Sequence, residues 1–345
     1  MMRAGFPAAD MERIMIYPKW LKPGDTVGIT APSAGLREEK LEKFDRSLEH
    51  IKKEGYQVRE TASVRSGLIA SASGETRGRE FMELVEDKDI DMICCAAGGE
   101  FLIEMLPFLD YEKIRENPKW IQGYSDPTSI LFSVTTGLDI ATIYGCNGGG
   151  FGMTKLHPSL KENLKLWKGQ LAEQTCYDLY EGEWPEEEVD GYYLTTPVEW
   201  KTPNGPVNVS GRLIGGCMDC LLDLLGTPYE HAAEFAKRYA ADGVIWYFDV
   251  YDMTAESVYR TLLHMGSAGW FENAKGFIFG RVTFPHSMIE MTYEEAAVRA
   301  LGKEMPLIME ADVGHVSPRM TFVNGCVAHV EAADGKGRIR YEWRK

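Results

Sequence analysis

The sequence lacks an excess of positive charge: its 345 residues include 37 Lys and Arg against 52 Asp and Glu, a formal net charge of -15. Because phosphate groups are bound by basic patches, this balance argues against nucleic acid or an anionic membrane as the main partner. No apolar run approaches the roughly 18–20 residues that span a bilayer. The opening stretch, MMRAGFPAADMERIM, has no continuous apolar segment of the kind found in export signals. We therefore expect a cytoplasmic protein that binds neither membrane nor nucleic acid.

Cysteine and histidine are also scarce, with seven of each. An odd number of cysteines, with Cys94 and Cys95 adjacent in an apolar stretch, is typical of reduced, buried thiols rather than of a disulfide framework. Cys217 and Cys220 have CxxC spacing, but no second CxxC and no pair of histidines lies near them in the sequence. We therefore predict a protein without a metal or another cofactor.

The composition that remains is that of a globular protein, with 44% hydrophobic and 26% charged residues. At roughly 150 residues per domain, a chain of this length favours two domains. Residues 174–210 are acidic and aromatic, with Pro and Gly, and this change of texture marks a boundary. We predict an N-terminal domain over residues 14–173, a linker over 174–210 and a C-terminal domain over 211–345.

Strand-like and helical segments alternate along the first half of the chain. Leu41, Phe44, Leu48 and Ile51 recur at helical spacing within a helix predicted over 38–54. The expected strands are 20–31, 56–58, 90–97, 120–123 and 140–144, and the other expected helices are 76–86, 101–109 and 129–136. The second half continues with strands at 244–248, 276–279 and 307–309 and helices at 257–265 and 293–301. This alternation predicts parallel βαβ units, which bind ligands at the carboxyl ends of their strands.

Two turns at predicted strand ends could build an oxyanion site. In Gly123-Tyr124-Ser125-Asp126 a serine lies where a strand turns into a helix, and the next amide lies at the helix N-terminus. The alternative is that Ser125 or Asp126 only caps that helix, since the G-x-S-x-G pattern is incomplete. The glycine pair 98–99 follows a buried strand and could supply a second amide, or could form a plain tight turn.

One histidine and one aspartate stand at positions suited to proton transfer. His315 lies in a loop with Gly and Pro after a predicted strand, where a general base belongs. Asp249 ends the strand 244–248 and could orient a histidine. Structural roles for both residues remain the alternative at this point, since most histidines and strand-terminal aspartates are not catalytic.

Taken together, these segments resemble the LD-carboxypeptidase family of serine peptidases, which includes the microcin C self-immunity peptidases. The matching stretches, in the family's order, are LKPGDTVGITAPS (21–33), the glycine pair 98–99, NPKWIQGYSD (117–126), GRLIGG (211–216), GTPY (226–229) and Gly314-His315. The resemblance implies that Ser125 is the nucleophile and His315 the base. It also implies that the amides of Gly99 and Asp126 form the oxyanion hole.

The resemblance further implies a fold and a third catalytic member. The expected fold is a Rossmann-like N-terminal α/β domain with a parallel sheet, carrying the serine, and a smaller α/β or β-rich C-terminal domain carrying the acid and the histidine. The family usually has Glu where this chain has Asp249, an Arg where it has Ala97, and Tyr-Gly where it has Glu100-Phe101. A homodimer is expected on the same basis.

The resemblance leads to an expected substrate as well. The chain length and the acidic, aromatic segment are similar to the microcin-immunity branch, in which an aromatic residue stacks on a nucleobase; Trp184 and Trp200 are the candidates. Gly98 and Glu100 are expected beside the substrate. We expect a serine peptidase that hydrolyses an amide near the C-terminus of a muropeptide or of a peptidyl- or aminoacyl-nucleotide conjugate. One alternative is a catalytically impaired family member that only sequesters such a ligand. The other is a nucleotide-dependent oxidoreductase, which is supported only by the βαβ pattern because the sequence lacks the glycine-rich fingerprint of such enzymes.

Overall fold

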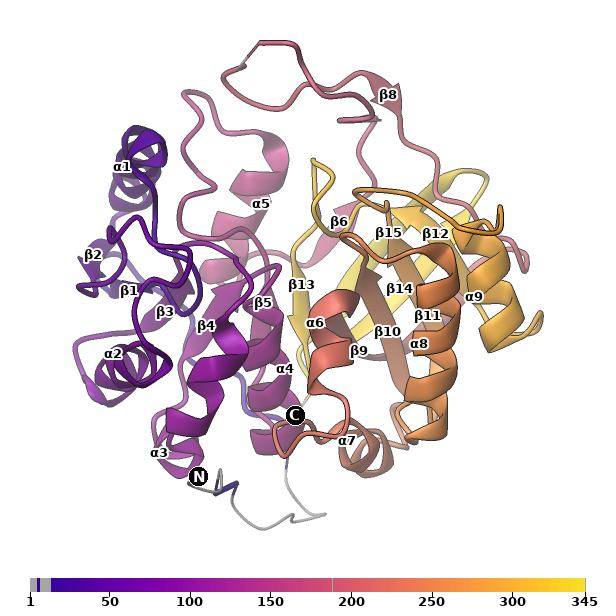
Figure 1. Cartoon of the computed structure of the whole chain (residues 1–345), viewed down its shortest axis with the longest axis horizontal. Coiled ribbons are helices and arrows are strands. Elements are labelled where there is room, and N and C mark those ends of the chain that lie inside the picture. Colours follow the sequence, from indigo (N-terminus) through magenta and orange to yellow (C-terminus); the bar gives the residue numbers. More distant parts are fainter. Residues whose placement is uncertain (1–4, 7–13, 188, 345) are drawn as a thin grey trace. The chain divides into compact units, whose positions relative to one another are not determined.

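The computed structural model of the chain describes residues 5–6, 14–187 and 189–344 (Figure 1). Most of the N-terminal stretch considered above for an export signal lies outside these residues, as do Glu188 and Lys345. Contacts divide the chain into two compact units. Unit 1 comprises the residues up to Leu171 together with Thr321–Asn324, and unit 2 comprises Ala172–Met320 and Gly325–Arg344.

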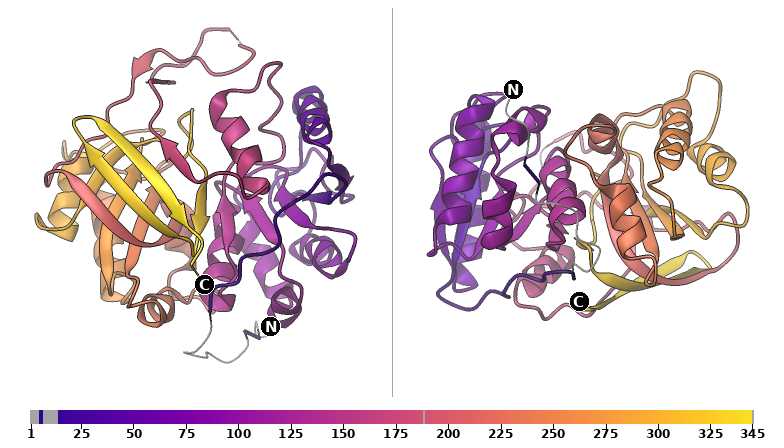
Figure 2. Two further views of the ribbon diagram at one scale, coloured as in Figure 1. Left: turned by 180° about the vertical axis from the view of Figure 1, so that it is seen from behind. Right: turned by 90° about the horizontal axis from the view of Figure 1, so that it is seen from below.

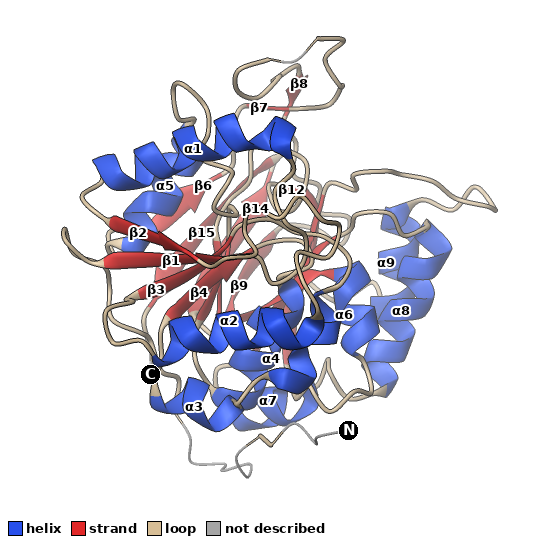
Figure 3. Ribbon diagram, turned by 60° about the vertical axis from the view of Figure 1, so that its left-hand side comes forward, coloured by secondary structure: helices blue, strands red, loops and turns tan. Residues whose placement is uncertain are grey.

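Unit 1 is built on a six-stranded sheet in the order β13-β5-β4-β3-β1-β2. Its strands are β1 (Thr26–Thr30), β2 (Gln57–Glu60), β3 (Met92–Cys95), β4 (Trp120–Gly123), β5 (Thr142–Tyr144) and β13 (Phe322–Asn324). Its helices are α1 (Glu38–Lys53), α2 (Gly74–Glu86), the 3-10 helix η1 (Leu102–Phe108), α3 (Tyr111–Glu116), α4 (Thr128–Leu138) and α5 (Pro158–Trp167). The pairs among β1 to β5 are parallel, and β13 pairs antiparallel with β5. In Figure 3, α1 and α5 lie on one face of this sheet and α2 and α4 on the other, which is a doubly wound arrangement.

Local sequence accounts for most helix boundaries in unit 1. Helix α1 buries Phe44, Leu48 and Ile51, the positions whose spacing predicted it, and carries acidic residues in its first turn and basic residues in its last. The stretch predicted as a helix over 101–109 forms a 3-10 helix instead. Pro107 lies inside it and cannot donate the backbone hydrogen bond that a regular α-helix requires there.

The strand order places three loops at one edge of the sheet. Strand order reverses between β1 and β3, and ligands of doubly wound sheets bind at the carboxyl ends of strands beside such a switch point. The loops that leave β1, β3 and β4 at that edge contain Ser33, the glycine pair 98–99 and Ser125, respectively. The fold of unit 1 therefore gathers the two turns singled out in the sequence.

Unit 2 contains a seven-stranded sheet in the order β12-β11-β10-β9-β14-β15-β6 and a two-stranded ribbon, β7-β8. Its strands are β6 (Glu173–Thr175), β7 (Leu179–Tyr180), β8 (Thr196–Pro197), β9 (Val207–Cys217), β10 (Val244–Asp249), β11 (Ala274–Gly280), β12 (Leu307–Ala311), β14 (Val327–Ala333) and β15 (Lys336–Glu342). Its helices are α6 (Met218–Leu224), α7 (Ala232–Arg238), α8 (Ala255–Ser267) and α9 (Tyr293–Leu301). Strands β9 to β12 are parallel, while β14 and β15 form the long antiparallel hairpin drawn in yellow in Figure 2. Unit 2 is therefore a mixed α/β unit.

Much of the stretch expected as a linker, 174–210, is built into unit 2. Strand β6 pairs with β15, and β9 already begins at Val207. Between them, Trp200 forms a β-bridge with Gly335 and Lys201 one with Met309. The backbone hydrogen bonds of this stretch are therefore largely satisfied by unit 2 itself.

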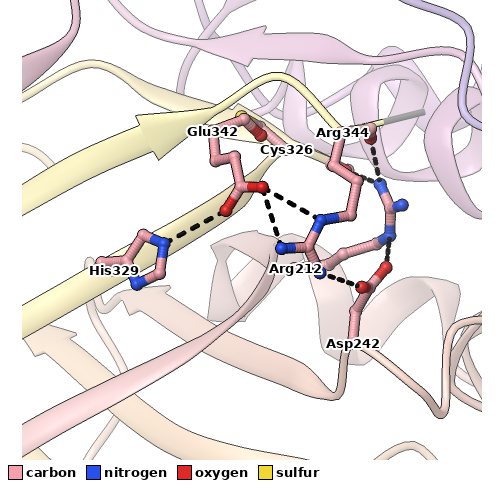
Figure 4. A network of polar contacts seen from close by, with 7 residues as sticks. Arg212, Asp242, Cys326, His329, Glu342 and Arg344 are labelled. Atoms are coloured by element: carbon pink, nitrogen blue, oxygen red, sulfur yellow. Dashed lines mark hydrogen bonds and ion pairs between the residues drawn. The ribbon is translucent and has the colours of Figure 1, made fainter.

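A cluster of charged groups lies where β10 and β14 begin and β15 ends (Figure 4). Arg212, from the GRLIGG stretch, has a side chain only 1% exposed and donates from Nε to Asp242 at 2.8 Å. Its Nη1 donates to the carbonyl oxygens of Gly325 at 2.7 Å and Arg344 at 3.2 Å. The half-exposed Arg344 reaches the other Asp242 oxygen at 2.8 Å and also pairs with Glu342. Arg212 is therefore the buried centre of this cluster and Arg344 its exposed rim.

Three observations bear on the chemistry of the whole chain. The seven cysteines are all free thiols. Among the described residues, no group of three or more His, Cys, Asp or Glu side chains could hold a metal ion. Within the same residues, no helix combines the length and the apolar character needed to cross a membrane.

Replacing the buried arginine of the cluster should destabilise unit 2 far more than replacing the exposed one. Arg212→Ala leaves the largely buried Asp242 with only the half-exposed Arg344 as its partner and removes the donor to the Gly325 carbonyl, so we expect a loss of about 3–5 kcal/mol in the free energy of unfolding. Arg344→Ala removes a solvent-screened pair and should cost about 1 kcal/mol or less. Urea unfolding followed by tryptophan fluorescence measures both. Equal losses for the two variants would contradict the assignment of Arg212 as the buried centre.

Candidate active site

The turn between β4 and α4 has an unusual backbone. Ser125 has φ 69°, a left-handed conformation that is unfavourable for residues other than glycine. The turn is closed by hydrogen bonds from the Thr128 amide to the Ser125 carbonyl at 2.8 Å and from the Ser129 amide to the Asp126 carbonyl at 3.0 Å. The N-cap position of α4 is Pro127, which makes no side-chain cap, rather than Ser125 or Asp126. A strained serine at a strand-to-helix turn is the geometry of a nucleophile elbow.

Two residues missed in the sequence hold this turn from the neighbouring strand. Asn147 accepts a hydrogen bond from the Tyr124 amide at 3.1 Å and donates to the Tyr124 carbonyl at 3.3 Å. The Ser125 amide donates to the hydroxyl of Tyr144, the last residue of β5, at 3.3 Å. The sequence signal that could have identified them is their position at or just after the carboxyl end of the strand predicted over 140–144. In the fold this strand, β5, pairs with β4, which carries the turn.

The glycine pair lies directly against the nucleophile turn. A Cβ atom at Gly98 would lie 3.0 Å from both Cβ and Oγ of Ser125, so a side chain there would crowd the serine. Gly99 has φ +143°, and a Cβ atom there would collide with Ser33 Oγ. Within the described residues, the amides of Gly99 and Asp126 donate no hydrogen bond to another protein group. Both are therefore available to a ligand oxygen, as an oxyanion hole requires.

The side chain of Asp126 is buried behind this turn. It accepts hydrogen bonds from Ser33 Oγ and, at 2.9 Å, from the Leu102 amide. Burial, with a smaller contribution from the negative charge of Glu100, raises the pKa of Asp126 to about 6 against the opposing effect of these hydrogen bonds. Glu100 itself is exposed, so this predicted substrate-side residue presents its carboxylate to solvent within electrostatic reach of the turn.

In unit 2, Asp249 and His315 form a close pair. Asp249, the last residue of β10, is fully buried, and its Oδ2 lies 2.8 Å from His315 Nδ1. The other oxygen, Oδ1, accepts the His315 backbone amide at 3.3 Å. Gly314 has φ +101°, and a Cβ atom there would collide with the Asp249 carboxylate, which explains why glycine precedes this histidine. The pair fixes both the imidazole ring and the backbone that carries it, which is what a general base needs.

Aromatic rings continue from His315 toward the surface of unit 2. The Tyr251 ring lies 4.6 Å from the imidazole, centroid to centroid, and meets the Phe284 ring edge-on at 5.2 Å. Phe284 stacks with Trp184, centroid to centroid at 6.4 Å, and Trp184 is 72% exposed. Trp184 also lines a cavity of about 340 Å³ together with Tyr180, Arg281, Glu310 and other residues of unit 2. Trp184 therefore has a free ring face beside a cavity that could hold a flat ligand group.

Trp200, the second candidate for stacking on a ligand, lies in the core. It is 1% exposed, and its indole Nε1 donates to Asp312 at 3.0 Å. Asp312 also pairs with Arg281 at 2.8 Å, and it begins the loop that carries His315. Burial leaves Trp200 no face for a ligand, so the expectation of a stacking role for Trp200 is corrected: it supports the loop after β12 instead.

The predicted residues therefore fall into two groups, each assembled within one unit. Unit 1 brings together Ser125, Asp126 and the 98–100 turn. Unit 2 brings together Asp249 and His315, with Trp184 at the end of the aromatic row. The first group contains a serine with a strained backbone and two amides that donate to no protein group among the described residues, and the second contains an imidazole held by a carboxylate.

Two domain models of one family match this chain. Residues 27–145 match the model of the LD-carboxypeptidase N-terminal domain, and residues 210–330 match that of the C-terminal domain. Microcin C7 self-immunity protein MccF of Escherichia coli is 26% identical over 324 residues, which cover 88% of this chain and 90% of that protein. A Bacillus subtilis protein named probable murein peptide carboxypeptidase is 25% identical over 329 residues, 92% of each protein.

Solved structures show the same fold. MccF in complex with glutamyl sulfamoyl guanosine, and with aspartyl sulfamoyl adenosine, each match with a TM-score of 0.79 at 23% identity, over 95% of this chain and 99% of the other. Muramoyltetrapeptide carboxypeptidase from Oxalobacter formigenes matches with a TM-score of 0.72 at 19% identity, over 93% and 100%. The two domain matches, which lie in the order and at the positions of the two residue groups described above, show that this chain belongs to the LD-carboxypeptidase family.

Proposed function

We propose that this protein is a serine carboxypeptidase that cleaves an amide near the C-terminus of its substrate through an acyl-enzyme. The observation that carries the proposal is the left-handed Ser125 at the β4–α4 turn, with the Gly99 and Asp126 amides unoccupied beside it. The proposal assigns Ser125 of unit 1 and the His315–Asp249 pair of unit 2 to the same reaction. Membership of a family of serine carboxypeptidases supports this assignment.

The reaction follows from the chemistry of these groups. Ser125 Oγ attacks the substrate carbonyl while His315 Nε2 takes its proton, and the carbonyl oxygen becomes an oxyanion that accepts hydrogen bonds from the Gly99 and Asp126 amides. Collapse breaks the C–N bond, and His315 returns the proton to the leaving amine. Water, deprotonated by His315, then hydrolyses the ester and releases the acid. Asp249 holds the tautomer with the proton on Nδ1 and stabilises the imidazolium.

Aspartate in place of the family's usual glutamate is compatible with this role. The shorter side chain of Asp249 already brings Oδ2 to 2.8 Å from the imidazole, because Gly314 lets the His315 loop approach the end of β10 closely. A longer side chain would have to fit a fully buried position that is already filled. The substitution is therefore matched by its surroundings, and it gives no support to the sequestering alternative.

Two substrate classes fit the relatives. MccF binds aminoacyl sulfamoyl nucleosides, and the Bacillus and Oxalobacter proteins are named for murein peptides and muramoyltetrapeptide. The exposed ring of Trp184 beside its cavity favours a conjugate with a flat group. We propose a muropeptide or a peptidyl- or aminoacyl-nucleotide conjugate as the substrate, acted on by a cytoplasmic homodimer.

Ser125→Ala should abolish hydrolysis and covalent labelling while leaving the fold intact. A fluorophosphonate reacts with an activated serine by forming an O–P bond as fluoride leaves, so intact-mass analysis counts one adduct per active serine. We expect one adduct on the wild type and none on Ser125→Ala or His315→Ala, with a loss in kcat of about 10⁴-fold or more.

Circular dichroism of each variant is the control for folding. A folded wild type that forms no adduct and hydrolyses neither substrate class, yet binds one of them in calorimetry, would replace the enzyme by the sequestering function. An adduct that persists on Ser125→Ala would assign the nucleophile to another residue.

Asp249→Asn should lower kcat by about 10⁴-fold with little change in KM, because tautomer control acts in the transition state. Asp249→Glu keeps the charge but displaces the imidazole, and a misplacement of about 1 Å costs on the order of 100-fold. Asp252→Asn is the matched control, since Asp252 is 63% exposed and lies 3.9 Å from His286 rather than at His315. Steady-state kinetics of the three variants tests the ranking. An Asp249→Asn enzyme as fast as the control would remove Asp249 from the mechanism.

Glu100→Gln should favour substrates with a free carboxylate near the scissile amide. The exposed Glu100 carboxylate repels such a group, and solvent screening limits the gain to about 1.5- to 5-fold in KM at low salt. A substrate whose carboxylate is amidated should show no gain, and neither should Glu83→Gln, a control 64% exposed on α2. An equal gain for charged and amidated substrates would show that Glu100 does not act through its charge.

A further inference from the structure

The side chain of Asp126 binds groups from two other loops of unit 1. Its Oδ2 accepts hydrogen bonds from Ser33 Oγ and from the Leu102 amide at 2.9 Å. Ser33 Oγ in turn accepts the Phe101 amide at 3.2 Å. One carboxylate and one hydroxyl, both buried, therefore hold the second and third amides after Gly99.

The same hydroxyl touches the glycine turn itself. Gly99 passes so close to Ser33 that a Cβ atom there would collide with the hydroxyl and would lie 2.9 Å from the Ala34 amide. The Ala34 amide donates to the Gly98 carbonyl at 3.1 Å. The 33–34 segment therefore holds the Gly98–Gly99 peptide group, which carries the Gly99 amide, while Ser33 and Asp126 hold the backbone at Phe101 and Leu102.

A buried arginine anchors both segments from behind. Arg77, fully buried in α2, donates from Nη1 to the carbonyls of Pro32 at 2.8 Å and Phe101 at 2.7 Å. The loop that carries Ser33 and the loop that carries the glycine turn are thus tied to one guanidinium. Arg77 fixes where the two loops meet, and Ser33 with Asp126 fixes how the glycine turn lies between them.

We propose that Asp126 and Ser33 are positioning residues for the oxyanion hole: the residue that supplies one donor amide also holds, through its side chain and the Ser33 hydroxyl, the turn that supplies the other. The proposal rests on the proposed function, since it needs an oxyanion to be stabilised at Gly99 and Asp126. Loss of the hydrogen bond between Ser33 and Asp126 should lower the rate of acyl transfer without changing the affinity for substrate. The reason is that the oxyanion hole binds the carbonyl oxygen tightly only in the transition state.

The buried carboxylate of Asp126 lowers the free energy of unfolding when it is ionised, whereas a residue with a purely structural role would raise it. The raised pKa of Asp126 means that burial opposes its ionised form, with Glu100 adding to the effect and Arg77, Ser33 and the Leu102 amide opposing it. A carboxyl whose pKa is higher in the folded than in the unfolded chain binds fewer protons after unfolding, so it makes the fold less stable as pH rises from about 4 to about 6. At pH 7.5 the ionised side chain of Asp126 therefore destabilises the fold, although it positions the turn that carries Gly99.

The first test compares Ser33→Ala with Ser71→Ala. Ser71 is a buried serine of the same region whose hydroxyl donates to the Ala31 carbonyl at 2.6 Å and not to Asp126, so it is a matched control. We expect Ser33→Ala to lower both kcat and the rate constant of fluorophosphonate labelling by about 10- to 100-fold with unchanged KM, and Ser71→Ala to match the wild type. Hydrogen exchange should be faster at the amides of Phe101 and Leu102 in Ser33→Ala only.

The second test uses Asp126→Asn at pH 7.5 and needs no change at Ser33. A neutral amide avoids burying a charge, so we expect a midpoint of thermal unfolding equal to or above that of the wild type. Its oxygen makes weaker hydrogen bonds to Ser33 and to the Leu102 amide than a carboxylate does, so we also expect a lower kcat. A purely structural role predicts a lower midpoint and an unchanged kcat. If Ser33→Ala does not fold, Asp126→Asn still decides between the two.

The outcomes separate this inference from the proposed function. Wild-type labelling at Ser125 combined with unchanged rates in Ser33→Ala and Asp126→Asn would overturn the positioning role alone. Absence of both labelling and hydrolysis in the wild type would overturn the proposed function and the positioning role with it.

Discussion

A left-handed backbone at Ser125 is the constraint around which unit 1 is arranged. For a serine, this conformation is about 1–3 kcal/mol less stable than a right-handed or extended one. It persists only where surrounding contacts hold the backbone in place. Here Tyr144 and Asn147 hold the turn from the side of β5, and Gly98 leaves room for the serine on the side of β3. The buried polar groups around the turn follow from the same need, because a strained loop at a sheet edge must be fixed by hydrogen bonds rather than by apolar packing alone.

Unit 2 also contains a loop whose backbone is held in place by close contact with a side chain. There, too, a short loop follows a parallel strand, and a glycine with positive φ brings the loop backbone against a side chain from the neighbouring part of the sheet. Gly314 allows Asp249 to bind both the imidazole and the backbone of His315. In both units the candidate residues lie at or just after the carboxyl ends of parallel strands, so the sheet helps to set the geometry of the loops that carry them.

The sequence predicted the elements with strong periodicity and missed those without it. Helix α9 was predicted at its observed bounds, and α1 differs by one residue, because apolar spacing and charged ends mark both. The longest strand of unit 2, β9, was not recognised over GRLIGG, since its glycines carry no strand signal and its pairing comes from β10 and β14. Strand β13 is too short to have a periodicity of its own.

The residues that could carry chemistry were easier to find than the residues that hold them. Turn and loop motifs pointed to Ser125 and His315, whereas Ser33 and Asn147 act through contacts that only the folded sheet creates, 93 and 23 residues away from their partners in the chain. Trp200 shows the opposite failure, because an aromatic residue in an acidic, Pro-containing segment looks exposed in sequence and is 1% exposed in the fold. Burial is decided by partners distant in sequence, and single-sequence patterns do not contain them.

The edge strand of unit 1 has a consequence for how the protein is made. Strand β13 completes the unit 1 sheet by pairing with β5, yet it lies in the chain between β12 and β14 of unit 2. During synthesis, the first five strands of this sheet leave the ribosome with the β5 edge open, and it stays open until nearly all of unit 2 has been translated. A nascent chain therefore carries an uncapped strand for most of its synthesis, and a fragment that stops near residue 171 would keep that edge permanently. Neither unit is a continuous stretch of chain, which couples the completion of the first to the emergence of the second.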